Sequence, residues 1–209
     1  MIEQGSPEWH QLRVGKVTAS RVADVARKLK SGGISKDRDR YAGELVAERM
    51  TGVPAQRYSN VEMQWGTANE ADARASYALT TGASVVQVAF VDHPRLRMTG
   101  ASPDGLVDDD GLVEIKCPAT HTHIATLLGG PIDPDYATQM LWQMACTDRA
   151  WCDFVSFDPR LPVDMQLHVV RFNRDDVRIA TLEAEVAKFL DEIDATEAEL
   201  RRKFRSEAA

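Results

Sequence analysis

The sequence predicts an α/β or α+β domain in which a mixed β-sheet is flanked by helices. Segments with apolar residues at helical spacing stand at both ends of the chain, and strand-like segments fill most of the middle around one further helical segment. The 209 residues, 44% hydrophobic and 27% charged, suit one large globular domain that spans residues 1–209.

Three helices are predicted before the first strand. A cap at Thr18 or Ser20 begins the first helix, which reaches about residue 29 before a Ser-Gly-Gly sequence breaks it. The second helix covers about residues 39–50 and ends at a Thr-Gly pair. The third covers about residues 66–79, and its apolar side carries Ala68, Ala71, Ala75 and Leu79.

Strands are predicted where β-branched residues are common and turn residues separate the runs, at residues 83–91, 95–101, 105–107 and 111–117. Pro118 ends the last of these because proline has no main-chain N–H to donate. A helix over about residues 134–146 leads to two more strands, at 151–157 and 165–171. Asn173 then caps a long terminal helix with an apolar stripe.

Charge is unevenly distributed along the chain. The net charge is −7, yet residues 13–40 contain nine Lys and Arg and only three Asp. This basic segment has two interpretations, a solvated helix face followed by a loop, or an arm that contacts phosphates. Acidity elsewhere would limit non-specific binding to DNA.

Cysteine content and hydropathy indicate where the protein works. Cys117, Cys146 and Cys152 form no CxxC pair, so we expect small buried hydrophobic residues rather than disulfides or a structural zinc site. The chain has no apolar run of the roughly 18 residues that a membrane span needs, and residues 1–7 lack the apolar stretch of a secretory signal. These features predict a cytoplasmic protein without membrane contact.

The predicted strand at residues 111–117 carries charged side chains on one of its faces. Because side chains alternate along a strand, Val113, Ile115 and Cys117 share an apolar face, and Glu114 and Lys116 lie on the opposite one. A carboxylate and an amine are rarely buried without partners. The pair therefore marks a candidate functional site.

The turn before this strand adds a second carboxylate. A hairpin centred on Asp109 places Asp104 opposite Glu114. Two facing carboxylates repel each other and raise one pKa unless a divalent cation lies between them. Mg²⁺ prefers such oxygen ligands, the carbonyl of Ile115 is a further candidate ligand, and Lys116 is placed to orient or deprotonate an attacking water. The alternative is a surface hairpin in which Glu114 and Lys116 form an ion pair.

Motifs spread over nearly the whole chain extend this pattern. They are Glu3-Gln4-Gly5, Glu8-Trp9-His10, Thr18-Ala19-Ser20, Trp65-Gly66, Asp72-Ala73-Arg74, Pro103-Asp104, Glu114-Ile115-Lys116, Leu128-Gly129-Gly130, Tyr136, Gln139 and Asp158-Pro159-Arg160. In this order they resemble the phage lambda exonuclease family, which includes YqaJ-like viral recombinases and alkaline exonucleases and belongs to the PD-(D/E)XK nucleases.

The resemblance implies a restriction-endonuclease-like fold and a magnesium-dependent, processive 5′→3′ exonuclease. Such an enzyme digests linear double-stranded DNA from its ends, releases 5′ mononucleotides and leaves 3′ single-stranded overhangs. The resemblance also implies two Mg²⁺ ions per active site, which Mn²⁺ can replace, and a homotrimer ring. It further implies a single-strand annealing protein as the partner in phage-type recombination, inside a bacterial host cell.

The resemblance also assigns roles to the metal site. Carried over by position, Asp104, Glu114 and the main-chain carbonyl of Ile115 would bind metal, and Lys116 would handle the nucleophilic water. Glu70 would complete the site from its helix. Without the resemblance, Glu70 near a helix start could simply favour the helix dipole.

Contacts with DNA are implied at other positions. Arg13, Ser20 and Ser102 would form a pocket for the 5′ phosphate, and Gln139 would hold the water or the scissile phosphate. Further DNA contacts are expected at Lys30 and Met63, the latter as an apolar wedge. Ser20 could instead be only a helix cap, and Arg13 only a structural ion-pair residue.

Two other functions fit part of the pattern. One is a DNA-end-binding module without catalysis, which the clustered carboxylates argue against because they repel phosphates. The other is a restriction-type endonuclease on the same fold, which would need a recognition domain for which 209 residues leave little room.

Overall fold

A five-stranded mixed sheet with the strand order β2-β5-β6-β7-β8 forms the centre of the protein. Its strands are β2 (Val85–Val86), β5 (Gly105–Val107), β6 (Gly111–Lys116), β7 (Trp151–Phe157) and β8 (Leu167–Asn173). Strands β6 and β7 are parallel, and the other neighbours are antiparallel. The computed structural model describes residues 2–28, 33–55 and 60–205.

A smaller mixed sheet lies beside it, in the order β1-β4-β3. Its strands are β1 (Val17–Thr18), β4 (Thr99–Ala101) and β3 (Val91–Asp92). Strand β4 pairs in parallel with β1 and antiparallel with β3. Two mixed sheets flanked by helices confirm the predicted fold class.

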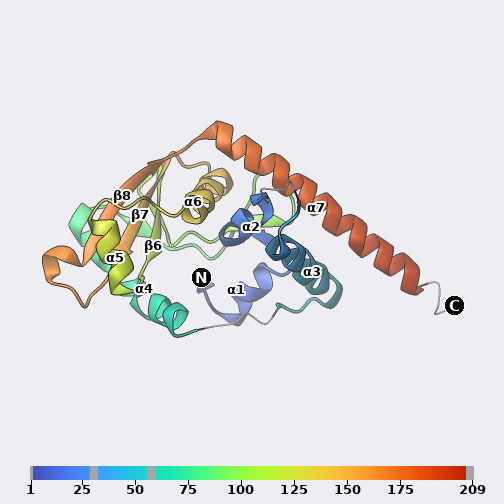
Figure 1. Ribbon diagram of the computed structural model, residues 1–209, viewed down its shortest axis with the longest axis horizontal. Helices are drawn as coiled ribbons and strands as arrows, with labels where there is room; N and C mark the ends of the chain where they lie inside the picture. Colours follow the sequence, from blue (N-terminus) through green and yellow to red (C-terminus); the bar gives the residue numbers. More distant parts are fainter. Residues whose placement is uncertain (1, 29–32, 56–59, 206–209) are drawn as a thin grey trace.

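Helices surround both sheets (Figure 1). They are α1 (Pro7–Leu12), α2 (Val22–Ala26), α3 (Lys36–Thr51), α4 (Val61–Thr81), α5 (Thr120–Leu127), α6 (Pro134–Thr147) and α7 (Asp176–Arg205), with 3-10 turns η1 (Ala19–Arg21) and η2 (Val163–Met165). The long helix α7 runs past α2 and α3 and projects beyond the rest of the protein (Figure 1).

The central sheet has a hydrophobic core on each face, as alternation along β6 predicts. Leu112 packs on one side, with residues of α2, α3, α6 and α7. Val113 and Ile115 pack on the other side, against Ala73 and Tyr77 of α4. Glu114 and Lys116 therefore point towards the α6 side of the sheet.

The predicted apolar side of the third helix is wrong. Ala68, Ala71 and Ala75 are exposed, and Leu79 is 88% exposed. Helix α4 instead buries Ala73 and Tyr77, which pack against Val113 and Ile115, and the Tyr77 hydroxyl donates to Asp153 Oδ2 in β7 at 2.7 Å. Alanine spacing gives little information on which side faces the sheet, since an alanine side chain gains little from burial.

Several predicted boundaries also differ from the structure. The first predicted helix divides into η1 and α2 and ends at Ala26, and the strands predicted at 83–91 and 95–101 shrink to β2, β3 and β4. Asn173 is the last residue of β8, and Asp175 caps α7 by accepting from the main-chain N–H of Val177 and Arg178. Helices α1 and α5 were not predicted.

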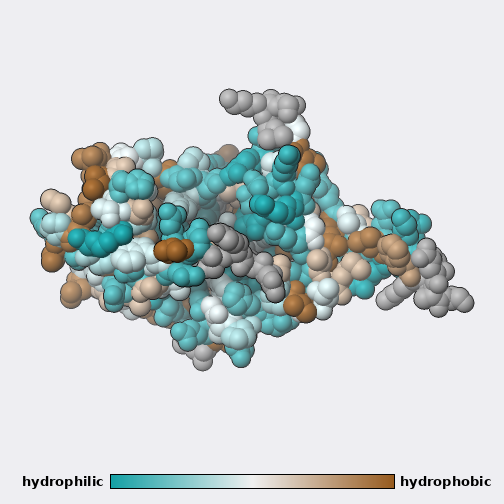
Figure 2. All heavy atoms as spheres, turned by 60° about the horizontal axis from the view of Figure 1, so that its bottom comes forward, coloured by the Kyte–Doolittle hydropathy of each residue, from teal (hydrophilic) through white to brown (hydrophobic). Residues whose placement is uncertain are grey.

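The state of the cysteines and the distribution of hydrophobic side chains on the surface can be compared with the sequence. All three cysteines are free and buried, as predicted. Hydrophilic side chains cover most of the face in Figure 2, and hydrophobic ones gather in small groups at the end farthest from the C terminus and along α7. In the described part of the chain, no helix is long and apolar enough to cross a membrane.

Candidate active site

The β5–β6 hairpin has the register that the sequence predicts. Gly105 pairs with Val113, and Val107 pairs with Gly111. The Nη1 atom of Arg149 holds the turn by donating to the carbonyls of residues 107, 108 and 111 at 2.9, 3.0 and 2.7 Å. This register brings Asp104 and Glu114 to facing positions at the open end of the hairpin.

Glu114 is buried, at 1% exposure, and side-chain donors surround its carboxylate. Oε1 accepts from Lys116 Nζ at 2.5 Å and from Gln139 Nε2 at 2.7 Å, and Oε2 accepts from Gln143 Nε2 at 2.6 Å. Gln139 and Gln143 stand four residues apart, on one face of α6. Gln143 is not among the predicted site residues, although its four-residue spacing from Gln139 could have indicated it.

Asp104 lies at the other side of the site, and its Oδ2 accepts from the main-chain N–H of Ile115 at 2.6 Å. Burial, followed by the negative charges of Glu114 and Glu70, raises the pKa of Asp104 well above its usual range. Burial and neighbouring carboxylates both disfavour the ionised form of an acid.

Lys116 is half-buried and pairs with Glu114. Its ammonium lies 4.7 Å from the ring centroid of Tyr136 on α6. Burial opposes its charge, but the carboxylates of Glu114 and Asp104 outweigh burial and raise the pKa of Lys116 above its ordinary value. As the site stands, Lys116 is therefore a charged donor.

Glu70 reaches the site from the middle of α4 rather than from a helix start. It pairs with Arg74, whose Nε donates to the carbonyl of Asp104 at 2.9 Å. Because α4 begins nine residues earlier, at Val61, an interaction with the helix dipole no longer explains Glu70. Arg74, which has no role in the predicted site, links Glu70 to the hairpin.

Two of the three residues predicted to bind the 5′ phosphate are joined through Trp9. The Trp9 Nε1 atom donates to Ser102 Oγ at 3.0 Å, and the Arg13 guanidinium carbon lies 3.8 Å from the centroid of the Trp9 ring. Ser20 follows β1 and Ser102 follows β4, and these strands are parallel, so both serines leave the small sheet at the same edge. Ser20 is exposed and Arg13 is buried.

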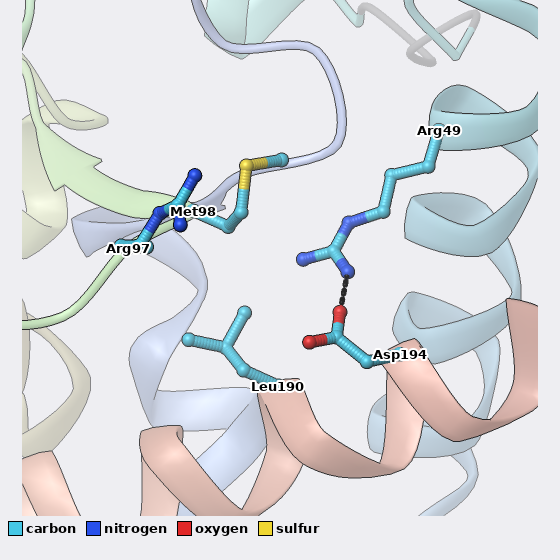
Figure 3. A pocket seen from close by; sticks show the side chains of 5 residues that line it. All are labelled: Arg49, Arg97, Met98, Leu190 and Asp194. Atoms are coloured by element: carbon cyan, nitrogen blue, oxygen red, sulfur yellow. Dashed lines mark hydrogen bonds and ion pairs between the residues drawn. The ribbon is translucent and has the colours of Figure 1, made fainter. Parts of the chain in front are cut away.

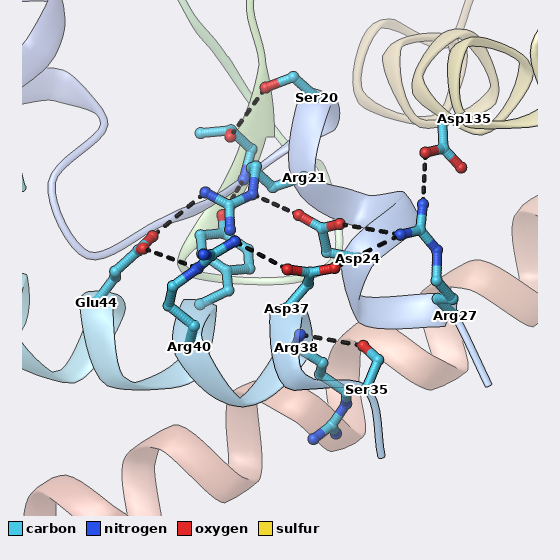
Figure 4. A network of polar contacts seen from close by, with 12 residues as sticks. Ser20, Arg21, Asp24, Arg27, Ser35, Asp37, Arg38, Arg40, Glu44 and Asp135 are labelled. Carbon is cyan, nitrogen blue, oxygen red and sulfur yellow. Dashed lines mark hydrogen bonds and ion pairs between the residues drawn. The ribbon is translucent and has the colours of Figure 1, made fainter. Parts of the chain in front are cut away.

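Ion pairs neutralise most of the basic segment at residues 13–40, and Figure 4 shows those of Arg21, Arg27 and Arg40. The pairs are Lys16–Asp92, Arg21–Asp24, Arg27–Asp135, Lys28–Glu185, Arg38–Glu192 and Arg40–Asp37. These contacts favour the structural interpretation of the segment over a phosphate-contacting arm. Lys30 lies outside the described residues, and Met63 is 56% exposed in the first turn of α4.

Figure 3 shows a pocket of about 310 Å³ that no residue of the β5–β6 hairpin lines. It is lined by Arg49, Arg97, Met98, Leu190 and Asp194, and an ion pair between Arg49 and Asp194 crosses it. None of these is a predicted site residue. The candidate active site is thus the charged end of the hairpin rather than this pocket.

The hairpin offers oxygen ligands suited to a hard divalent cation. Asp104 and Glu114 supply two carboxylates. Their negative charges lie close to that of Glu70, and a bound cation would offset this repulsion. Glu114 is engaged by Lys116 and Glu70 by Arg74, and among the described residues no three His, Cys, Asp or Glu side chains are arranged to hold a metal as they stand.

Residues 8–150 match the model of the YqaJ-like viral recombinase domain. The match covers more than half of the chain, and the protein belongs to the YqaJ-like viral recombinase family, as the sequence motifs predict. A comparison with curated proteins gave no match.

Solved structures share the fold. An alkaline exonuclease from Laribacter hongkongensis, LHK-Exo, is 50% identical and superposes with a TM-score of 0.89, over 98% of this chain and 100% of that one. The structure of LHK-Exo in complex with dAMP gives the same values. A phage related exonuclease from Haemophilus somnus 129PT, 17% identical, has a TM-score of 0.67 over 91% of this chain and 99% of its own, and shows the fold alone. The family match and the 50% identical relative identify the chain as an exodeoxyribonuclease.

Proposed function

We propose that the protein is a magnesium-dependent, processive 5′→3′ exonuclease on linear double-stranded DNA. In this proposal it releases 5′ mononucleotides and leaves 3′ single-stranded overhangs for annealing-dependent recombination. The observation that carries the proposal is the arrangement of Glu114, which is buried among Lys116, Gln139 and Gln143 and faces Asp104 across one hairpin.

The carboxylates are proposed to serve as metal ligands. Asp104, Glu114 and the Ile115 carbonyl would hold Mg²⁺, Glu70 would complete a site for two ions, and Mn²⁺ would substitute. The bound cations would act as Lewis acids on the scissile phosphate. Glu70 would need to leave its ion pair with Arg74, which is a half-buried contact between neighbouring turns of α4.

The remaining side chains of the site position the reactants. Lys116 carries its proton at Nζ, close to Glu114, and from there would orient the attacking water and offset charge growing on the phosphate. Gln139 would hold the water or the phosphate through its amide. Gln143 lies deeper, at 0% exposure, and anchors Glu114 from behind.

The proposed polarity depends on a 5′-phosphate site formed by Arg13, Ser20 and Ser102. A terminal 5′ phosphate carries more charge than an internal phosphodiester, so a guanidinium and two hydroxyls would prefer it. Arg13, Ser20 and Ser102 supply these groups, and Ser102 is only two residues from Asp104. Binding of the 5′ end there would place the adjacent phosphodiester at the carboxylates after each cut.

Processivity is proposed to come from a homotrimer ring around the duplex. Most cations of the basic segment are paired within the chain, so a single copy neutralises few phosphates and would bind DNA weakly. A closed ring with three-fold symmetry would keep the enzyme on its track. Sedimentation should give a trimer, and a processive monomer would contradict this part of the proposal.

One digestion assay tests the catalytic proposal against its rivals. Wild type and Glu114→Ala are incubated with Mg²⁺ and either linear 5′-phosphorylated duplex or closed circular duplex. We expect the wild type to release mononucleotides from the linear DNA only, and the variant to release none while remaining folded by circular dichroism. Opening of the circle would indicate an endonuclease, and intact linear DNA with the wild type would indicate a non-catalytic end-binding module.

A further inference from the structure

Arg160 is held rigidly where the chain leaves the central sheet. Its Nε and Nη2 atoms donate to the two oxygens of Asp158 at 2.7 and 2.9 Å, and Nη2 also donates to the carbonyl of Pro118 at 3.3 Å. Its guanidinium lies 4.3 Å from the ring centroid of Trp65. Although burial favours the neutral acid, hydrogen bonds from Arg160 and Thr120 lower the pKa of Asp158 to about 2, so Asp158 stays ionised beside Arg160.

This arginine lies at the same end of the sheet as the active site. Strands β6 and β7 are parallel, and Lys116 pairs with Ser156, so Lys116 and Asp158 leave the sheet at one edge. Pro118, which Arg160 contacts, is only two residues after Lys116. Trp65 belongs to α4, the helix that also carries Glu70.

Part of the Arg160 guanidinium remains available to a ligand. Its side chain is 45% exposed, and within the described residues its Nη1 atom makes no hydrogen bond. A guanidinium that is already fixed by Asp158 and Trp65 loses little side-chain entropy when it binds an anion. Beside an exonuclease active site, the anion that must pass is the phosphate backbone of the DNA.

We propose that Arg160, stacked on Trp65 and braced by Asp158, binds a backbone phosphate of the strand being cut. This inference rests on the proposed function and adds a DNA contact to it. The contact positions the strand next to Lys116, and Arg160 takes no part in bond cleavage.

The chain offers a matched control in the neighbouring strand β8. Arg171 donates to Asp153 at 2.5 and 3.2 Å, its guanidinium lies 3.4 Å from the Trp151 ring centroid, and its side chain is 50% exposed. Arg171 pairs with Asp153, which lies three residues before Ser156 in β7, or about 10 Å at roughly 3.3 Å per residue. Asp153 in turn pairs with Val113, whose side chain packs on the face of the sheet opposite to Glu114. Arg171 thus repeats the chemistry of Arg160 away from the end of the sheet where Lys116 lies.

The test is the salt dependence of DNA binding. A linear 5′-phosphorylated duplex is titrated with wild type, Arg160→Gln and Arg171→Gln in Ca²⁺, where binding is measured without turnover. Loss of one phosphate contact should reduce the slope of log K against log salt by about 0.9, so the affinity deficit of Arg160→Gln should shrink about 3.5-fold between 50 and 200 mM salt. Arg171→Gln should keep the wild-type slope. Equal slopes for the two variants would overturn the inference.

A second variant separates lost charge from lost structure. Arg160→Lys keeps the positive charge without the planar guanidinium, so its slope of log K against log salt should return to within a few tenths of the wild-type value. Arg160→Gln and Arg160→Lys should unfold at similar temperatures. A reduced slope that lysine leaves unrestored would also overturn the inference. Wild-type protein that neither binds nor digests the duplex would refute the proposed function. If the wild type binds and digests the duplex but Arg160→Gln keeps the wild-type salt slope, only the Arg160 contact would be refuted.

Discussion

Replacement of Gly111 by alanine should destabilise the hairpin that carries the carboxylates. A Cβ atom at this position would lie 2.1 Å from Cη2 and Cζ2 of Trp151, far inside contact distance. The Trp151 ring has little room to retreat, since its Nε1 atom donates to Asp110 Oδ1 at 3.1 Å and the Arg171 guanidinium stacks on it. The strain must therefore move the β6 main chain.

Overpacking of this kind costs about 1–3 kcal/mol. In a protein of 150–250 residues each kcal/mol lowers Tm by about 2–4 °C, so Gly111→Ala should lower Tm by roughly 2–12 °C. Gly111 also pairs with Val107 and accepts a hydrogen bond from Arg149, so a displaced main chain would disturb the register that sets Asp104 opposite Glu114. Digestion should slow along with the loss of stability.

Denaturant unfolding of four proteins measures the clash directly: wild type, Gly111→Ala, Trp151→Ala and the double variant. If the ring causes the cost, alanine at 111 should be far less destabilising in the Trp151→Ala background, with a coupling energy of about 1–3 kcal/mol. A Gly111→Ala protein that melts within about 1 °C of wild type would refute the reasoning. An equal cost in both backgrounds would do the same.

Three further predictions concern the site and its surroundings. Lys116→Ala should bind DNA yet cleave it very slowly in single-turnover assays. Lys116→Arg should not restore the rate fully, because a guanidinium has a different shape and holds its proton more tightly than an ammonium. Near-normal cleavage by Lys116→Ala would show that the lysine has only a structural role. Arg13→Ala should reduce the preference for 5′-phosphorylated over 5′-hydroxyl duplex when initial rates are compared, and a wild type without that preference would contradict the pocket. Because the pKa of Asp158 is lowered to about 2, its carboxylate stabilises the fold above pH 3.8 and loses that effect as the pH falls towards 2. The denaturant concentration at the unfolding midpoint should therefore fall between pH 3.8 and pH 2 in the wild type, and it should fall less in Asp158→Asn.

Local patterns in the sequence were sufficient to predict the central hairpin. A three-aspartate turn before glycine and strict alternation along β6 determine both the register and the face on which Glu114 lies. Gln139 was predicted from the resemblance. Gln143, which is equally close to Glu114, was not predicted, because its only signal in the sequence is its four-residue spacing from Gln139.

Features that depend on distant partners were less predictable. A phosphate-contacting arm remained one of two interpretations of the basic segment, because several of its acidic partners are remote in sequence, as in the pair of Lys28 with Glu185. Helix α1 is only six residues long, and the bonds of Trp9 to Ser102 and to the Ala89 carbonyl hold it in place from far along the chain. Short helices have too few internal hydrogen bonds to be stable without such contacts.

The position of α7 has a consequence for the order in which the protein can fold. Val22 of α2 and Leu45 of α3 share a core with Val186 and Phe189 of α7, and ion pairs such as Arg38–Glu192 join the same helices. Because α7 begins at Asp176, a ribosome makes most of the chain before this helix exists. Helices α2 and α3 therefore complete their packing only after α7 has been synthesised, and we expect slow folding that is dominated by contacts between residues far apart in the chain.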